Sequence, residues 1–226
     1  MTNQEPLSPA LNLAPVAQVA TVAQLMLVVS SATNAFSTWS DWNRYWVAED
    51  YVAGVPGVGV ADLVGADNTS ASSTWLTLLA LLATAAVFLT WLWRARHNAE
   101  LLSRAEHRLS RGWTIGGWFC PIVNLWFPRF VVDDIWRASR PGVPTDQYRV
   151  HGLEKSPLVR AWWYTLIVNW LVLLFLRFET RGPLSVDTLA TVAVYSTVSL
   201  VLLVTAAALL ARIIRQITAW QSVPRY

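Results

Sequence analysis

Four long stretches of the chain are apolar and free of charged side chains. A helix needs about 20 apolar residues to cross the hydrocarbon core of a bilayer. The stretches at 14–36, 75–93 and 188–211 reach or approach that length. The stretch at 161–176 is shorter, but Arg160 and Arg177 bracket it and can extend their charged ends to the membrane surfaces. The pattern predicts an all-α membrane protein with four transmembrane helices.

A fifth apolar stretch, at 112–128, is interrupted by glycine and proline. Pro121 lies inside it and Pro128 at its end, and a proline breaks the ladder of helical hydrogen bonds. We therefore predict a broken, re-entrant or interfacial helical segment over 112–139. Whether 112–128 re-enters the bilayer or lies along its surface stays open. The whole chain, 1–226, then forms one integral membrane domain, with 41–74 as an outer loop whose part from Gly54 to Ser73 is rich in small residues and typical of a mobile loop.

The positions of Lys and Arg indicate an orientation, because these residues accumulate in cytoplasmic loops. If 112–139 does not span and the amino terminus is inside, 14 basic residues lie inside and three outside. If 112–128 spans fully, the numbers become seven inside and ten outside. The first arrangement fits the rule far better. It predicts a multi-pass protein of the plasma membrane with both termini and the broken segment on the cytoplasmic side.

Composition supports the membrane class and excludes several others. Hydrophobic residues make up 54% of the chain and charged residues 14%, against about 25% charged in soluble domains. The 14 tryptophans suit the membrane–water boundary. One cysteine permits no internal disulfide, and the histidines have no metal-binding spacing with acidic residues, so we expect no metal and no cofactor. The net charge of +3 comes from loops beside apolar segments, which favours anionic lipid over nucleic acid.

Polar residues in and near the broken segment are the candidates for chemistry. Asp133 lies four residues from both Arg129 and Arg137, so a helix would place the three on one face. We expect a solvated ion-pair face there, with a ligand or lipid-headgroup site as the alternative. Asn124 is expected to bind backbone groups that the break leaves free, and Asn169, in the middle of a span, to bond to another helix.

The run from Arg94 to Arg111 has leucines on one side and arginines elsewhere. This pattern is typical of a helix lying on an anionic membrane surface, although a plain positive stop signal explains it equally well.

The central block has a recognisable order of residues. Gly117-Trp118-Phe119-Cys120-Pro121 leads to Asn124-Leu125, a second proline at Pro128, and the ending Asp133-Asp134-Ile135-Trp136. This order resembles the bacterial, largely actinobacterial membrane family called Domain of Unknown Function 4328, over about residues 75–215. The resemblance implies a polytopic bacterial membrane protein and no particular reaction. The candidate binding or structural motif is Gly117, Trp118, Pro121, Asn124, Pro128, Arg129, Asp133, Asp134, Trp136 and Arg137, with Asn169 as an intramembrane polar residue.

Three functions are compatible with these residues. The first is a non-catalytic membrane component that binds the anionic inner leaflet, a partner protein or a second copy of itself at its basic cytoplasmic face. The alternative is a small transporter or channel that uses the broken segment around Asn124. A membrane enzyme is less favoured, because the adjacent Asp133 and Asp134 point about 100° apart on a helix and would not act together on one atom.

Overall fold

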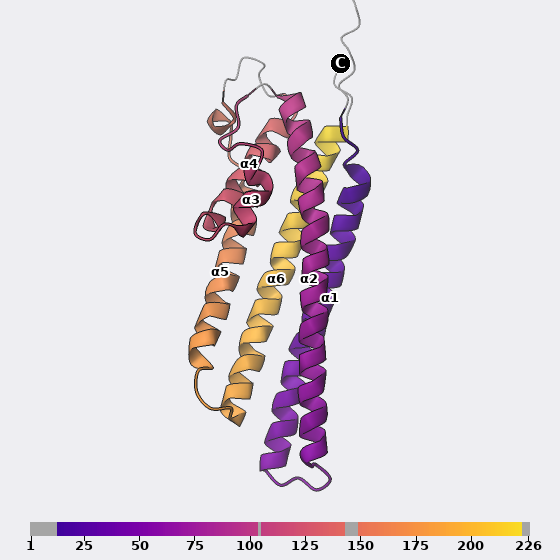
Figure 1. The fold of residues 1–226 in the computed structure, drawn as a ribbon, viewed down its shortest axis with the longest axis vertical. Helices are drawn as coiled ribbons and strands as arrows, with labels where there is room; N and C mark the ends of the chain where they lie inside the picture. The colour runs from indigo at the N-terminus through magenta and orange to yellow at the C-terminus, as the bar shows by residue number, and fades with distance from the viewer. Residues whose placement is uncertain (1–12, 104, 143–148, 223–226) are drawn as a thin grey trace, which may run out of the picture. The chain divides into compact units, whose positions relative to one another are not determined.

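The computed structural model describes residues 13–103, 105–142 and 149–222, and the regular elements in these ranges are helices (Figure 1). In chain order they are α1 (Ala17–Val52), α2 (Val60–Leu102), α3 (Trp113–Phe119), η1 (Val123–Leu125), α4 (Phe127–Ser139), η2 (Val150–Gly152), α5 (Pro157–Glu179) and α6 (Val186–Ser222). The predicted cytoplasmic ends of the chain, 1–12 and 223–226, lie outside the described residues.

Helices α1, α2, α5 and α6 are each long and apolar enough to cross a membrane. They contain 36, 43, 23 and 37 residues. At about 1.5 Å per residue even α5 reaches roughly 34 Å, beyond the ~30 Å of a hydrocarbon core. Each of the four predicted spans lies in one of these helices, except that residues 14–16 precede α1, so the all-α fold with four candidate membrane-spanning helices is confirmed. Helices α1, α2 and α6 are long enough to extend past the core.

The chain divides into two compact units. The first unit comprises residues 1–21, 88–156 and 213–226, and the second comprises 22–87 and 157–212. Helices α1, α2 and α6 contribute residues to both units. The single domain over 1–226 stays a prediction.

The predicted outer loop at 41–74 is wrong as secondary structure. Helix α1 continues to Val52 and α2 begins at Val60, so the connection is only 53–59. The start of α2 is stabilised because the Asp62 carboxylate accepts a hydrogen bond from the Gly59 backbone N–H at 2.8 Å. One turn further, Asp67 pairs with Arg44 of α1. Small residues predicted a loop here, but capping and contact with α1 make the segment helical.

The predicted surface helix over 94–111 is also wrong beyond residue 102, where α2 ends. The chain then becomes irregular until α3, and Arg104 lies outside the described residues. Backbone groups of this irregular segment form hydrogen bonds with residues far away in the sequence. The Val150 N–H donates to the Glu106 carbonyl at 3.1 Å, and the Arg108 N–H donates to Asp134 at 2.9 Å.

Hydroxyl groups and tryptophan link the helices of the second unit. Thr84 and Thr77 of α2 donate to the carbonyls of Met26 and Thr33 in α1, both at 3.1 Å. The Trp42 indole donates to Thr197 of α6 at 2.9 Å. Such polar contacts specify how apolar helices pair in a medium where water cannot compete.

Candidate functional site

The candidate motif lies in the first unit, on three consecutive short elements. Gly117 and Trp118 lie on α3, Pro121 in the turn after it, and Asn124 on η1. Helix α4 carries Pro128, Arg129, Asp133, Asp134, Trp136 and Arg137. The predicted break in the helical segment over 112–139 is confirmed, since the chain is not α-helical between Phe119 and Val123 or at Trp126.

Local chemistry explains how α3 and α4 meet. Pro128 lies in the first turn of α4, where its fixed φ suits a helix and no N–H is needed. The Asn124 amide donates to the Trp118 carbonyl at 3.3 Å, which confirms its predicted role toward freed backbone groups. A Cβ at Gly117 would lie 3.1 Å from the Cβ of Phe127, so glycine lets α3 approach the start of α4.

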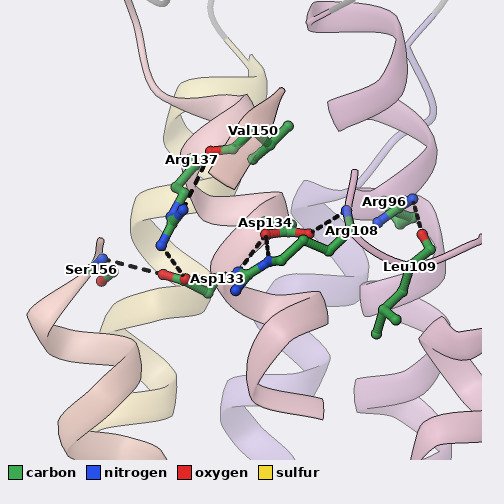
Figure 2. Close-up of polar contacts among 8 residues, drawn as sticks. All are labelled: Arg96, Arg108, Leu109, Asp133, Asp134, Arg137, Val150 and Ser156. Atoms are coloured by element: carbon green, nitrogen blue, oxygen red, sulfur yellow. Dashed lines mark hydrogen bonds and ion pairs between the residues drawn. The ribbon is translucent and has the colours of Figure 1, made fainter. Parts of the chain in front are cut away.

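Asp133 and Asp134 both bind one guanidinium, that of Arg108 (Figure 2). Arg108 Nη2 donates to Asp133 Oδ2 at 3.0 Å and to Asp134 Oδ1 at 2.5 Å. Its Nε donates to Asp134 Oδ1 at 2.8 Å, and its backbone N–H donates to Asp134 Oδ2. The irregular segment before α3 is thus fixed to α4 by four charge-assisted hydrogen bonds.

Asp133 has two further partners. Arg137 Nη2 donates to its Oδ2 at 2.6 Å, and the Ser156 backbone N–H donates to its Oδ1 at 3.2 Å. Arg137 Nη1 in turn donates to the Val150 carbonyl at 3.3 Å. Figure 2 shows these groups converging on α4 from the chain before α3 and from the chain after α4.

The pairing of Asp133 with Arg137 is confirmed, but the solvated ion-pair face is wrong. Asp133 is 3% exposed, Asp134 1% and Arg137 1%. Although adjacent residues point about 100° apart on a helix, both aspartates reach the guanidinium of Arg108, which is wide enough to bind two carboxylates. Arg129 lies beside the Phe130 ring, 5.9 Å from its centroid.

Sequence reasoning missed Arg108 as the partner of both aspartates. Two adjacent acidic residues on the buried side of an amphipathic helix signal a need for cationic partners. The segment between α2 and α3 contains three arginines that could supply this charge. Only the fold of the irregular segment decides which of them reaches α4.

Burial and charge shift the pKa values of two groups in this segment. Burial alone would lower the pKa of Arg108, but hydrogen bonds and charge from Asp134 and Asp133 raise it above the ordinary value, so the guanidinium stays charged. Burial, together with the charge of Arg96, lowers the pKa of His107 to about 4. His107 is therefore neutral at physiological pH.

An open, polar cavity of about 490 Å³ lies against the irregular segment. Its lining includes Arg96, His107, Arg108 and Arg111, together with Glu100 and Glu106. Arg96 is 3% exposed; its Nε donates to Glu100 at 2.8 Å and its Nη2 to the Leu109 carbonyl at 2.9 Å. Within the described part of the chain, Arg96 Nη1, Arg111 Nε and both ring nitrogens of His107 have no hydrogen-bond partner.

A buried amide network also fixes the first unit, and sequence reasoning did not find it. Asn98 exchanges two hydrogen bonds with the backbone of Ala14, at 2.7 and 2.9 Å, and donates to Gln221. Gln221 Nε2 donates to the Ala95 carbonyl and to Ser139. The network joins the residues before α1 to helices α2, α4 and α6.

Trp136, the end of the motif, contacts α6. Its indole N–H donates to Gln216 at 3.0 Å, and its ring packs edge-on against Trp220 with centroids 5.2 Å apart. In the second unit, Asn169 of α5 accepts a hydrogen bond from Ser199 of α6 at 2.7 Å. This contact between α5 and α6 confirms the inter-helix hydrogen bond predicted for Asn169.

Metal-ligating side chains are not clustered in the described ranges, where no three His, Cys, Asp or Glu residues are placed to hold an ion. That the protein uses no metal and no cofactor stays a prediction.

Comparison with known proteins supports one family. The family model described as "Domain of unknown function (DUF4328)" matches residues 57–219, which include the whole motif. No curated protein and no solved structure matches the chain.

Proposed function

Because the chain belongs to the DUF4328 family, whose description names no activity, we propose its function from its own residues. The protein is a non-catalytic membrane component. Its first unit lies on the cytoplasmic side and binds anionic lipid headgroups. The distribution of charge carries this proposal. The first unit has 12 basic and seven acidic residues, and the second has five basic and seven acidic. Short loops on the cytoplasmic side of a membrane protein carry an excess of Lys and Arg.

Three of the seven acidic residues of the first unit pair with arginines that are themselves wholly or largely buried, so they offset little of the positive charge at its surface. Asp134 pairs with Arg108, Asp133 with Arg137 and Glu100 with Arg96. Arg149, Lys155 and Arg215 are exposed, and so is Arg140, which pairs with Glu154. Each Lys or Arg near an anionic surface contributes about 1 kcal/mol to binding.

The cavity beside the irregular segment gives a headgroup a place to bind. Arg96 and Arg111 both line it, and each has a buried nitrogen without a hydrogen-bond partner in the described ranges. A phosphate oxygen satisfies such donors well, because charge-assisted hydrogen bonds are the stronger class. The engagement of both aspartates by arginine supports a non-catalytic role, since neither carboxylate is left available as an acid or base.

Lipid binding by detergent-purified protein tests the proposal. We expect phosphatidylglycerol to raise the melting temperature more than phosphatidylcholine, and added salt to weaken the difference. Arg111→Gln should weaken the response about fivefold in lipid concentration, which corresponds to the loss of about 1 kcal/mol.

Arg181→Gln is the matched control for this experiment. Both arginines lie over an aromatic ring, Arg111 over Trp93 at 4.5 Å and Arg181 over Phe178 at 4.2 Å, but Arg181 belongs to the second unit. Its variant should respond to phosphatidylglycerol as the unchanged protein does. Equal responses to both lipids, or equal losses in both variants, would contradict the proposal.

A further inference from the structure

The turn between α3 and α4 exposes large apolar side chains. Phe119 is 70% exposed, Ile122 73% and Leu125 47%, and they come from the end of α3, the turn and η1. Trp126 follows at 39%. Large apolar side chains exposed within one short turn are typical of a contact with a partner or a membrane. The first unit itself does not cover it.

The backbone at Ile122 directs this side chain outward at a cost. Its φ of 69° and ψ of −61° describe a γ-turn, closed by a hydrogen bond from the Val123 N–H to the Pro121 carbonyl at 2.8 Å. This turn is rare and strained, and a β-branched residue makes it more so. Strain of this kind is typically retained where it serves a function.

The turn also satisfies most of its backbone donors internally; among residues 120–126 the Ile122 N–H is the donor without a backbone acceptor. The N–H groups of Cys120, Asn124, Leu125 and Trp126 donate to carbonyls within residues 116–123, and Pro121 has no N–H. Irregular backbone enters an apolar medium only if its polar groups are satisfied, because water is not there to bind them. With one donor, the Ile122 N–H, left to satisfy, the turn largely meets the main condition for contact with acyl chains.

Length and charge set how deep such a contact reaches. Helix α3 has seven residues and spans roughly 10 Å, about a third of the hydrocarbon core. Residues 112–128 carry no charge, whereas Arg111 precedes them and Arg129 follows. Arginines at both flanks can bind lipid phosphates, and the apolar side chains of the turn between them can contact the upper part of the acyl chains.

We infer that residues 119–126 form a wedge that inserts Phe119, Ile122 and Leu125 into the upper acyl region of one leaflet. The wedge neither crosses the bilayer nor lies wholly in water. That the leaflet is the cytoplasmic one rests on the proposed function, whereas the insertion itself does not depend on anionic lipid.

Cys120 is the only cysteine and lies within the wedge, so it carries a site-specific probe without further change. The full chain is labelled there with an environment-sensitive fluorophore and reconstituted in phosphatidylcholine vesicles. Spin-labelled lipids quench from the headgroup, from the top of the acyl chain or from its end. We expect the strongest quenching from the top of the acyl chain. Strongest quenching by aqueous iodide, or from the chain end, would overturn the inference.

Ile122→Gly removes the tip side chain without threatening the fold, because glycine adopts a positive φ freely. We expect its melting temperature to be maintained or raised, while iodide quenching at Cys120 rises by about twofold or more as the wedge becomes shallower. The matched control is Val55→Gly, which removes an exposed apolar side chain from the 53–59 connection of the second unit.

Quenching in the Val55→Gly control should equal that of the unchanged protein. Unchanged quenching in Ile122→Gly would show that the tip does not determine depth and would overturn the inference. Quenching from the upper acyl region in phosphatidylcholine, together with no preference for phosphatidylglycerol in the melting experiment, would refute the proposed function and leave the wedge standing. The reverse combination would refute the wedge alone.

Discussion

Asp133 and Asp134 are adjacent on α4, and both are buried against the guanidinium of Arg108. With Arg137, which pairs with Asp133, the cluster contains two positive and two negative charges. Removing one partner of a buried pair is costly, because the remaining charge stays buried without compensation. At the scale of single residues, this cluster holds the segment between α2 and α3 against α4 through Arg108.

Replacement of Arg108 tests the cluster. We expect Arg108→Gln to lower the free energy of unfolding by about 3 kcal/mol, because two buried carboxylates lose a partner. Melting in detergent should then occur roughly 6 to 12 °C lower. Arg44→Gln removes an arginine from the exposed pair with Asp67 and should cost less than about 1 kcal/mol. Equal losses in the two variants would contradict the buried cluster.

His107 makes stability depend on pH. Its pKa is about 4 in the folded protein and about 6.5 when unfolded, so the unfolded chain binds the proton more tightly. The stabilisation is fully present above pH 6.5, and it is lost as the pH falls toward 4. By linkage the loss reaches about 3 kcal/mol. His107→Gln should flatten the curve of melting temperature against pH between 6.5 and 4, and an unchanged curve would assign that pH dependence to other groups.

At the scale of elements, the contact between α3 and the start of α4 depends on Gly117 but not on Gly116. A Cβ at Gly117 would lie 3.1 Å from Phe127, whereas at Gly116 the nearest atom, on Trp113, is 3.7 Å away. Both glycines are in α3, so alanine adds the same helical preference at each. We expect the Gly116→Ala protein to be more stable than the Gly117→Ala protein by about 1 kcal/mol or more, measured by melting. A smaller difference, or the opposite order, would mean that the contact can relax.

Several elements could be predicted because their signals are local. Pro121 and Pro128 indicated the break in the fifth apolar stretch, and Pro128 also marked where α4 begins. The four spans followed from apolar length alone. The helix over 60–73 could not be predicted, because its small residues favour a loop and its support comes from Asp62 at the cap and Arg44 on α1.

The candidate site divides in the same way. The Asp133–Arg137 pair follows from helical spacing. Arg108, Asn98 and Gln221 do not, because each acts on residues 25 or more positions away. No local sequence pattern predicts these long-range hydrogen bonds.

At the scale of the whole molecule, charge and hydropathy support one topology. In the topology that we propose, the four apolar helices return the chain to the side on which it began, and the positive charge of the first unit assigns that side to the cytoplasm. In the same proposal, the broken segment adds a wedge in one leaflet without adding a crossing. In this topology Lys155 is on the cytoplasmic side, and Val55, in the connection between α1 and α2, is on the outer side.

The most direct test of this topology is labelling of introduced cysteines in intact cells with a membrane-impermeant maleimide. Both positions are exposed, and Cys120→Ser provides a background without other thiols. We predict that Val55→Cys reacts in intact cells and that Lys155→Cys reacts only after the membrane is opened. Reaction of Lys155→Cys in intact cells, with Val55→Cys protected, would contradict the orientation and with it the binding of the inner leaflet.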